Sequence, residues 1–291
     1  MRRTLLLIAP LVAAACSGAD PADETFTIQT PSFTLQPGEE KFFCFYTTLP
    51  TTEVRGIHAM ASHMTPGSHH MIVFKTETQQ QPDGTFVECQ NFGMRGQDLP
   101  VWLYASQEPE QEMTLPEDIA IPLIAQQPVL VNMHYINQTE APITADVHVD
   151  LTAFPTTTHY HEAHAYVTFN DQIDIAPGAS GTVSGTCDVD PDVKFVALTT
   201  HSHRYTTSAE VLDGAASVLE TLDWEHATVN RYTDPYLQFS SGKLTYRCSY
   251  HNTTDQPLTT GESALTNEMC MAVGLYFPAS RDHYCLNSVA I

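Results

Sequence analysis

The sequence predicts an all-β protein made of two antiparallel β-sandwich domains in tandem. Short alternating or β-branched runs recur between turn signals such as Pro-Gly and Asp-Gly pairs, which is typical of strands joined by tight turns. Long segments with a 3.6-residue period are missing, and 19 prolines suit strands and loops better than helices. Only 117–126 is compatible with a helical turn or two. Strands are expected at 26–29, 42–47, 71–75, 129–135, 146–154, 165–169, 194–201, 244–250 and 272–277.

A change in composition near the middle of the chain separates the two predicted domains. Residues 156–164 include three consecutive threonines and three histidines, and they are typical of a linker. After them the pattern restarts with a strand and a Pro-Gly turn. We therefore expect an N-terminal domain over 26–155 and a C-terminal domain over 165–291, each of ordinary size for a single domain.

The first sixteen residues have the pattern of an export signal. Arg2 and Arg3 precede an apolar stretch that is too short to span a bilayer, and three alanines lead to Cys16. Small residues directly before a cysteine also indicate a bacterial lipoprotein signal, in which Cys16 becomes the lipidated N-terminus. Ordinary secretion, with Cys16 removed or left free, is the alternative. Residues 17–25 are expected to form a tether, and the protein is expected in the cell envelope or outside the cell.

The charge of the chain excludes one class of partner. Lys and Arg number 12 and Asp and Glu number 34, so the formal charge is 12 − 34 = −22. A surface this acidic repels phosphate backbones, and we expect no nucleic-acid partner. No apolar run has the roughly 18–20 residues that a spanning helix needs, so membrane contact is expected only through the possible lipid anchor.

Cysteine usage agrees with export. Removing Cys16 from the seven cysteines leaves six, an even number, and an exported protein lives where disulfides persist. Three bridges are expected, although six cysteines allow 15 pairings. No CxxC pair occurs, which argues against a thiolate zinc site or a thioredoxin-type redox centre. The six remaining residues are Cys44, Cys89, Cys187, Cys248, Cys270 and Cys285.

Histidine is in excess, with 14 residues, and three histidine clusters stand out at 68–71, 132–135 and 200–203. Residues two apart on a strand point to the same face, so His201 and His203 can bind one metal ion together. The adjacent pair His69 and His70 would face opposite ways on a regular strand, and both can reach one ion only at a strand end or a bulge. His134 lies in an apolar run, where a core histidine with a satisfied hydrogen bond is the alternative.

The type of metal follows from the ligands available. Imidazole suits zinc, copper, iron and nickel, whereas a methionine thioether prefers soft Cu(I). Met269 lies beside Cys270, near the end of the chain. A zinc protease is rejected because 161–164 lacks the HExxH spacing.

These motifs, taken in order, resemble the ascorbate-dependent type II copper monooxygenases, the family of the peptidylglycine α-hydroxylating and dopamine β-hydroxylating enzymes. The pattern comprises His69-His70-Met71, the His134-Tyr135 strand, His201-x-His203 and Glu268-Met269-Cys270, and it covers nearly the whole mature chain. The resemblance implies two jelly-roll domains that each hold one copper ion. It also implies the bridges Cys44–Cys89, Cys187–Cys285 and Cys248–Cys270.

The resemblance further implies a division of labour between the two copper ions. An electron-transfer copper would take His69, His70 and His134. An O₂-activating copper beside the substrate would take His201, His203 and Met269, which makes these three the expected catalytic residues. Ascorbate is the implied reductant and O₂ the co-substrate.

The substrate class is expected to differ from that of the peptide-amidating members. Those enzymes hold a substrate carboxylate with an Arg two residues before the His-x-His, where this chain has Thr199. They also use an Asn and a Tyr two and four residues after the Met ligand, where this chain has Met271 and Val273. We therefore expect hydroxylation of a small neutral or apolar molecule.

Two other functional classes compete with the enzyme. A non-catalytic copper protein for storage or delivery would keep the ligands and lose the substrate pocket. However, storage does not require two differently built sites. A purely structural exported sandwich with surface histidines leaves the ordered six-ligand pattern unexplained.

Overall fold

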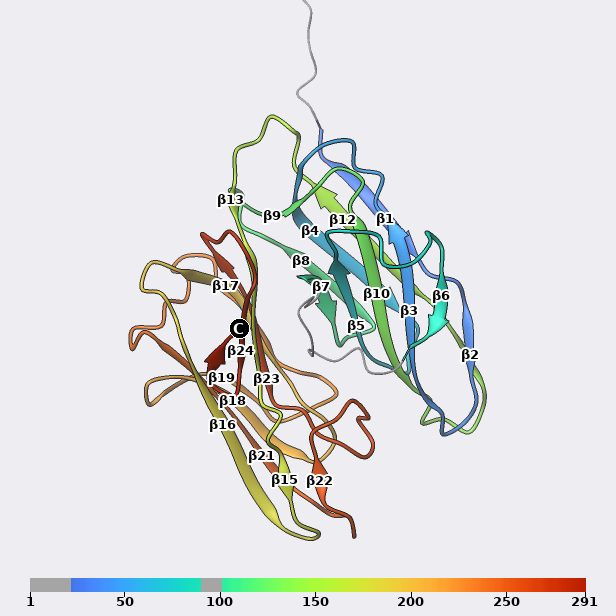
Figure 1. Ribbon diagram of the computed structural model, residues 1–291, viewed down its shortest axis with the longest axis vertical. Helices are drawn as coiled ribbons and strands as arrows, with labels where there is room; N and C mark the ends of the chain where they lie inside the picture. Colours follow the sequence, from blue (N-terminus) through green and yellow to red (C-terminus); the bar gives the residue numbers. More distant parts are fainter. Residues whose placement is uncertain (1–21, 90–100) are drawn as a thin grey trace, which may run out of the picture.

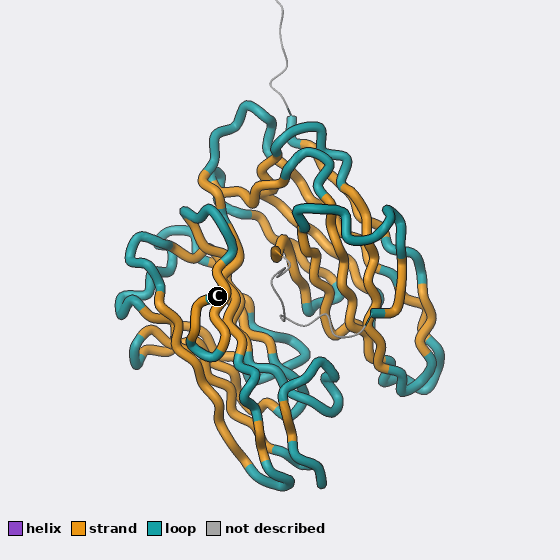
Figure 2. The backbone as a smooth tube through the Cα atoms, viewed as in Figure 1, coloured by secondary structure: helices purple, strands orange, loops and turns teal. Residues whose placement is uncertain are grey.

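The computed structural model describes residues 22–89 and 101–291, and within these ranges the chain is all β, without a helix (Figure 2). Among the described residues nothing forms a helix able to cross a membrane. The predicted export signal, Cys16 and most of the predicted tether lie outside the described residues. The all-β class is thus confirmed, and the tandem jelly-roll organisation stays a prediction.

The N-terminal half, which we define as strands β1–β13, contains two main sheets. One has the strand order β1-β12-β4-β9-β13 with β8 on β4, and the other has the order β6-β3-β10-β5-β7. A small two-stranded sheet, β11-β2, completes the N-terminal half. The strands are β1 (Glu24–Gln29), β2 (Phe33–Leu35), β3 (Glu40–Thr48), β4 (Arg55–Met64), β5 (Ser68–Lys75), β6 (Phe86–Glu88), β7 (Val101–Ser106), β8 (Glu110–Thr114), β9 (Ile119–Leu123), β10 (Pro128–Ile136), β11 (Ile143–Ala145), β12 (Val147–Ala153) and β13 (His161–Glu162).

Side chains from both main sheets share one hydrophobic core. Along β12 every second residue is buried, and Val147, Val149 and Leu151 are fully inside. Val131 and Met133 of β10, in the other sheet, belong to the same cluster. This two-residue period buries one face of each strand and is the physical basis of the strand prediction.

The C-terminal half, strands β14–β25, repeats this scheme. A six-stranded sheet β20-β17-β23-β14-β24-β25 and a four-stranded sheet β16-β21-β18-β19 contribute to a second core, and a β15-β22 pair lies beside them. The strands are β14 (His164–Phe169), β15 (Asp174–Ile175), β16 (Ser180–Asp188), β17 (Lys194–His201), β18 (Thr206–Asp213), β19 (Ala216–Thr221), β20 (Val229–Arg231), β21 (Lys243–His251), β22 (Leu258–Thr259), β23 (Met271–Phe277), β24 (His283–Leu286) and β25 (Val289–Ala290).

Every predicted strand coincides with an observed one to within three residues at its ends. The segment 117–126, compatible with a helical turn, instead contains β9, whose Ile119, Ile121 and Leu123 are buried. Sequence reasoning also missed the long strands β4, β16 and β18. The sequence of β16, SGTVSGTCD, has two glycines and no apolar alternation, so its strand depends on pairing with β21 along its whole length.

The segment predicted as a linker is attached to the N-terminal half. Its residues 161 and 162 form β13, which pairs in parallel with β9. The ring of Tyr160 lies where a side chain at Gly56 would have to be, with its Cε1 atom 2.5 Å from the position of a Cβ. A substitution of Gly56 would therefore displace this segment.

The two halves lie side by side, and they contact each other along β17 and β23 (Figure 1). Val196 and Ala197 of β17, with Leu275 and Phe277 of β23, belong to the same hydrophobic cluster as the N-terminal core. A polar contact joins the halves as well, because the backbone N–H of Trp102 donates to Asp282 Oδ2 at 3.0 Å. The halves are thus packed against each other, with both apolar and polar contacts between them.

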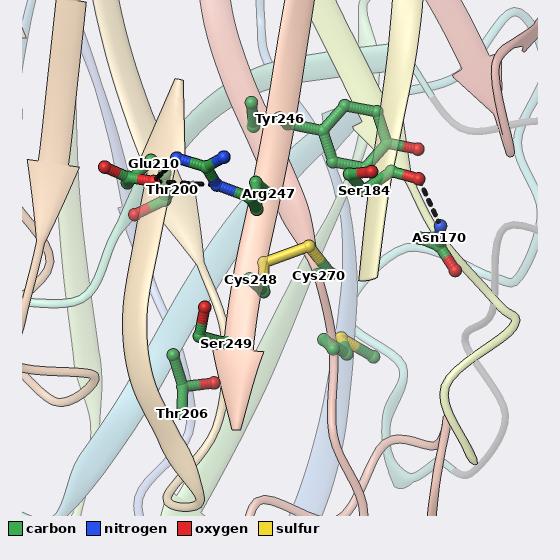
Figure 3. Close-up of a disulfide and its surroundings, with 12 residues drawn as sticks. Asn170, Ser184, Thr200, Thr206, Glu210, Tyr246, Arg247, Cys248, Ser249 and Cys270 are labelled. Atoms are coloured by element: carbon green, nitrogen blue, oxygen red, sulfur yellow. Dashed lines mark hydrogen bonds and ion pairs between the residues drawn. A yellow bond between two sulfur atoms is a disulfide. The ribbon is translucent and has the colours of Figure 1, made fainter. Parts of the chain in front are cut away.

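Three disulfides link the six cysteines of the described residues: Cys44–Cys89, Cys187–Cys285 and Cys248–Cys270. These are the pairs that the family resemblance implies. The Cys248–Cys270 bridge is buried and ties β21 to the residue next to Met269 (Figure 3). Three bridges indicate an oxidising compartment, such as the extracellular space.

Candidate metal centre

A β-bulge brings His69, His70 and His134 together. On the paired strands β5 and β10, His70 lies opposite His134, but the next pair is Ser68 with Tyr135. His69 is therefore the extra residue of the bulge and has no partner on β10. A bulge changes the direction of the side chain, so two adjacent histidines can face one point. The strand irregularity that this pair was predicted to need is therefore present.

The resulting triad is compact. The ring centres of His69 and His70 are 5.0 Å apart, those of His69 and His134 are 5.0 Å apart, and those of His70 and His134 are 5.1 Å apart. One nitrogen from each ring lies within 4.8 Å of the other two. We call this set the N-terminal triad.

Two histidines of the C-terminal half complete the cluster. His201 is the last residue of β17 and His203 follows in the next loop, and their ring centres are 5.3 Å apart. His69 lies 5.1 Å from His201 and 5.3 Å from His203, and nitrogens of these three rings also lie within 4.8 Å of one another. We call this second set the shared triad, because His69 belongs to both.

Sequence reasoning assigned these histidines to two separate sites, one in each domain. The structure instead places all five rings in one cluster between the halves, and the His70 and His201 rings are themselves only 5.0 Å apart. No local sequence pattern indicates this proximity, since His70 and His201 are 131 positions apart along the chain (201 − 70 = 131).

The five imidazoles are neutral at neutral pH. His69, His134 and His203 are buried, and His70 and His201 are partly exposed toward a cavity. Removal from water lowers the pKa of all five, and for four of them the neighbouring histidines lower it further. The pKa of His201 falls to about 3. Neutral imidazole is the form that binds a metal ion.

The donor set fits a metal ion such as copper. Within the described part of the chain, four of the five rings carry a buried nitrogen without a hydrogen-bond partner, and such groups are rare in folded proteins unless something satisfies them. Metal–nitrogen bonds of about 2.0–2.1 Å in a tetrahedral set place neighbouring ring centres about 5 Å apart, close to the spacing observed within each triad. The all-imidazole donor chemistry suits copper and zinc alike.

Glu40, which sequence reasoning missed, orients the N-terminal triad. Its carboxylate accepts the Nε2 proton of His134 at 2.8 Å, which leaves Nδ1 of His134 buried and free. The same carboxylate accepts Ser263 Oγ–H at 2.5 Å and the backbone N–H of Ala264 at 2.7 Å, both from the C-terminal half. Burial works to raise the pKa of Glu40, but these hydrogen bonds outweigh it and the pKa is lowered. Phe42 stacks on the His134 ring at 3.9 Å.

Acceptors also fix the rings of His201 and His203. The Nδ1–H group of His201 donates to Gln107 Oε1, which belongs to the N-terminal half. The Nδ1–H group of His203 donates to the backbone oxygen of Asn267 at 3.2 Å, and its Nε2 is buried and free. No sequence motif marks Gln107 or Asn267, because their role depends on contacts between distant segments.

Glu268, the residue before Met269, anchors the turn that follows His203. This buried carboxylate accepts the backbone N–H groups of His203 at 3.0 Å and Tyr205 at 2.7 Å, and the hydroxyl of Thr206 at 3.1 Å. Burial raises the pKa of Glu268 to about 7 although these hydrogen bonds act in the opposite direction. The backbone oxygen of the adjacent Met269 accepts the Tyr250 hydroxyl at 3.0 Å.

Met269 lines a cavity of about 870 Å³ that also exposes His70 and His201. This cavity lies between the halves, and most of its other side chains are apolar, including Phe42, Trp102, Phe169 and Leu275. Thr199, Met271 and Val273, which occupy the positions of the missing polar anchors, all line it. Arg204, the nearest cation in sequence to His203, is exposed and lies outside the lining.

Comparison with known proteins supports copper chemistry. Residues 163–291 match the family model described as copper type II ascorbate-dependent monooxygenase, C-terminal domain. The match supports this family and a copper- and ascorbate-dependent oxidoreductase. No curated protein matches the chain.

Likeness to solved structures is weak. The major capsid protein P2 from bacteriophage PM2 is 6% identical with a TM-score of 0.38, over 89% of this chain and 99% of that one. A peptide-N(4)-(N-acetyl-β-D-glucosaminyl) asparagine amidase is 8% identical with a TM-score of 0.35, over 88% of this chain and 97% of that one.

Proposed function

We propose that the chain is a copper-dependent monooxygenase that hydroxylates a C–H bond of a small neutral or apolar molecule with O₂ and an ascorbate-like reductant. His69, His70 and His134 would hold an electron-transfer copper ion. His201, His203 and Met269 would hold the copper ion beside the substrate. Bound copper would supply one-electron redox chemistry and a site for O₂.

The observation that carries the proposal is the cavity beside the cluster. His70, His201 and Met269 line it together with mainly apolar side chains, so a substrate held there would lie against ligands of both predicted sites. A volume of about 870 Å³ is within the range of small-molecule sites. The apolar walls would exclude water and orient a C–H bond toward these ligands.

The charges around the cavity disfavour an anionic substrate. Lys41 is the one lysine or arginine among the described lining residues, and it already lies 3.6 Å from Glu39 and 3.8 Å from Glu88. Glu108 likewise lies 3.0 Å from His226. A substrate carboxylate would therefore meet no unpaired lysine or arginine there. This supports the expectation that peptide amidation is not the reaction.

The residues around the ligands would keep the site ready for repeated turnover. Glu40, Gln107 and Asn267 each accept a hydrogen bond from one imidazole, so the rings are oriented before any ion binds. The thioether of Met269 would favour Cu(I), the oxidation state that reacts with O₂. We propose an exported protein; the lipid anchor at Cys16 stays a prediction.

Coupled oxygen consumption tests this proposal. Copper-loaded protein with ascorbate and a panel of neutral, apolar small molecules should consume O₂ only with some of them, and each such reaction should yield a hydroxylated product containing oxygen from ¹⁸O₂. His203→Ala should abolish this turnover, whereas His251→Ala, a change of an exposed histidine outside the cavity lining, should leave it intact. Copper binding without substrate-dependent O₂ uptake on any compound would favour storage or delivery instead.

A further inference from the structure

His69 is the ring that the two triads have in common. Its centre is 5.0–5.3 Å from those of His70, His134, His201 and His203, so it lies within metal-ligand spacing of two different sets. The rings of His134 and His203, one from each triad, are farther apart at 6.5 Å. His69 therefore lies between two groups of donors.

Both ring nitrogens of His69 are buried, and neither has a hydrogen-bond partner among the described residues. A histidine that binds one metal ion normally donates its other N–H to an acceptor. His134, His201 and His203 follow this rule through Glu40, Gln107 and Asn267. At His69 no such acceptor lies among the described residues, so its second nitrogen is available to a second metal ion.

Contacts outside the cluster hold the two triads at this distance. The Glu40 carboxylate joins β3 to Ser263 and Ala264 of the C-terminal half. Elsewhere in the interface, Trp102 donates to Asp282, and Phe277 packs in the N-terminal core. The sharing of His69 is therefore a property of the packed halves and not of the histidines alone.

We propose that His69 bridges two metal ions, with one ring nitrogen bound to the ion of each triad. This inference rests on the proposed copper function. His70 and His134 would complete one ion's imidazole set, and His201 and His203 the other's. The second ion to bind takes the place of the ring proton of His69, which passes to solvent. A shared ring would give electrons a direct covalent path between the two ions.

The spin count of the Cu(II)-loaded full-length protein tests the bridge. A bridging imidazole couples the two unpaired electrons, so metal analysis should give two copper ions per chain while low-temperature EPR loses most of the intensity of two spins. Acid release of the metal should then restore the full Cu(II) signal, which rules out reduction to Cu(I). Two copper ions with two full spins, or a single copper ion per chain, would overturn the bridge.

Two further measurements serve as controls. Loading with equal amounts of Cu(II) and Zn(II) should raise the EPR intensity per copper, because a Cu–Zn pair has a single spin; an unchanged low intensity contradicts the proposal. His69→Ala should restore the full intensity of whatever copper remains, and His226→Ala should leave the wild-type loss of intensity intact. A low EPR intensity per copper that persists in His69→Ala would also contradict the bridge.

These readouts separate the bridge from the proposed activity. Spin coupling is measured without substrate, ascorbate or O₂ turnover. Uncoupled copper in an active hydroxylase would reject the bridge alone. Coupled copper in a protein without hydroxylase activity would reject the enzyme and leave the bridge in place.

Discussion

At the residue scale, Glu40 shows how one carboxylate can serve both halves of the molecule. It fixes the His134 ring and also accepts two hydrogen bonds from the loop before Glu268. Removing such a partner of a metal-binding histidine typically costs about 10–100-fold in metal affinity. Glu40 is thus a positioning residue for the N-terminal triad.

Glu40→Gln should weaken copper binding by about 10–100-fold, because an amide is a weaker acceptor and its NH₂ group would face donors. Competitive copper titration measures this change. Glu39→Gln is the matched control, since Glu39 is only partly buried and contacts Lys41 rather than a histidine. Equal affinities for the two variants would show that Glu40 does not position His134.

Met269 supplies the one soft donor of the proposed sites. Met269→Ile keeps a similar volume and removes the sulfur atom, so the sulfur contribution to the Cu(I) X-ray absorption spectrum should disappear while the imidazole contribution remains. Met271→Ile is the natural control, because Met271 also lines the cavity and has a thioether. A sulfur signal that survives in Met269→Ile and is lost in Met271→Ile would assign the ligand to Met271.

At the scale of single elements, a β-bulge and a disulfide position the predicted ligands. The bulge in β5 turns His69 toward His70 and His134. The bridge from Cys248 on β21 to Cys270 holds the start of β23, next to Met269. Each feature acts over a few residues and fixes the strand backbone beside a predicted ligand.

Replacing Cys248 and Cys270 together by alanine should lower the free energy of unfolding by about 2–4 kcal/mol. The same variant should weaken the Cu(I) sulfur signal, because Met269 loses its fixed neighbour. Replacing Cys187 and Cys285 should also destabilise the fold but leave that signal unchanged, since this bridge joins β16 and β24, which carry no predicted ligand. Chemical denaturation and X-ray absorption give the two readouts, and a sulfur signal equal in both variants would contradict this role.

At the scale of the whole molecule, the packing of the two halves places five neutral histidines at their interface. The ordinary pKa of histidine is about 6.5, so the unfolded chain takes up protons there below this pH. In the folded protein without metal, the lowered pKa values keep the cluster neutral. The unfolded state then binds more protons, and stability falls as the pH decreases below about 6.5.

The melting temperature of the metal-free protein should therefore drop steadily from pH 7 toward pH 4. Each cluster histidine contributes up to about 1.4 kcal/mol per pH unit in this range. Glu268, whose pKa is raised to about 7, acts in the opposite direction as one group against five. His70→Gln should flatten the slope and His148→Gln, a change on the outer face of β12, should not. A melting temperature that is constant with pH would contradict the buried neutral cluster.

The sequence by itself determined the all-β class and nine of the 25 strands in the described residues, and it predicted which residues are ligands. These depend on local properties: the two-residue period of buried side chains, the spacing of histidines and the count of cysteines. It also indicated that His69 and His70 need an irregular strand, because regular strand geometry separates neighbours.

Only the tertiary structure decided how the ligands meet. Glu40 contacts Ser263 across 223 positions of chain, and Gln107 contacts His201 across 94. No local pattern encodes such contacts, since they arise when the apolar faces of β17 and β23 pack against the N-terminal core. That packing brings the five imidazoles together and places His69 between two sets of donors.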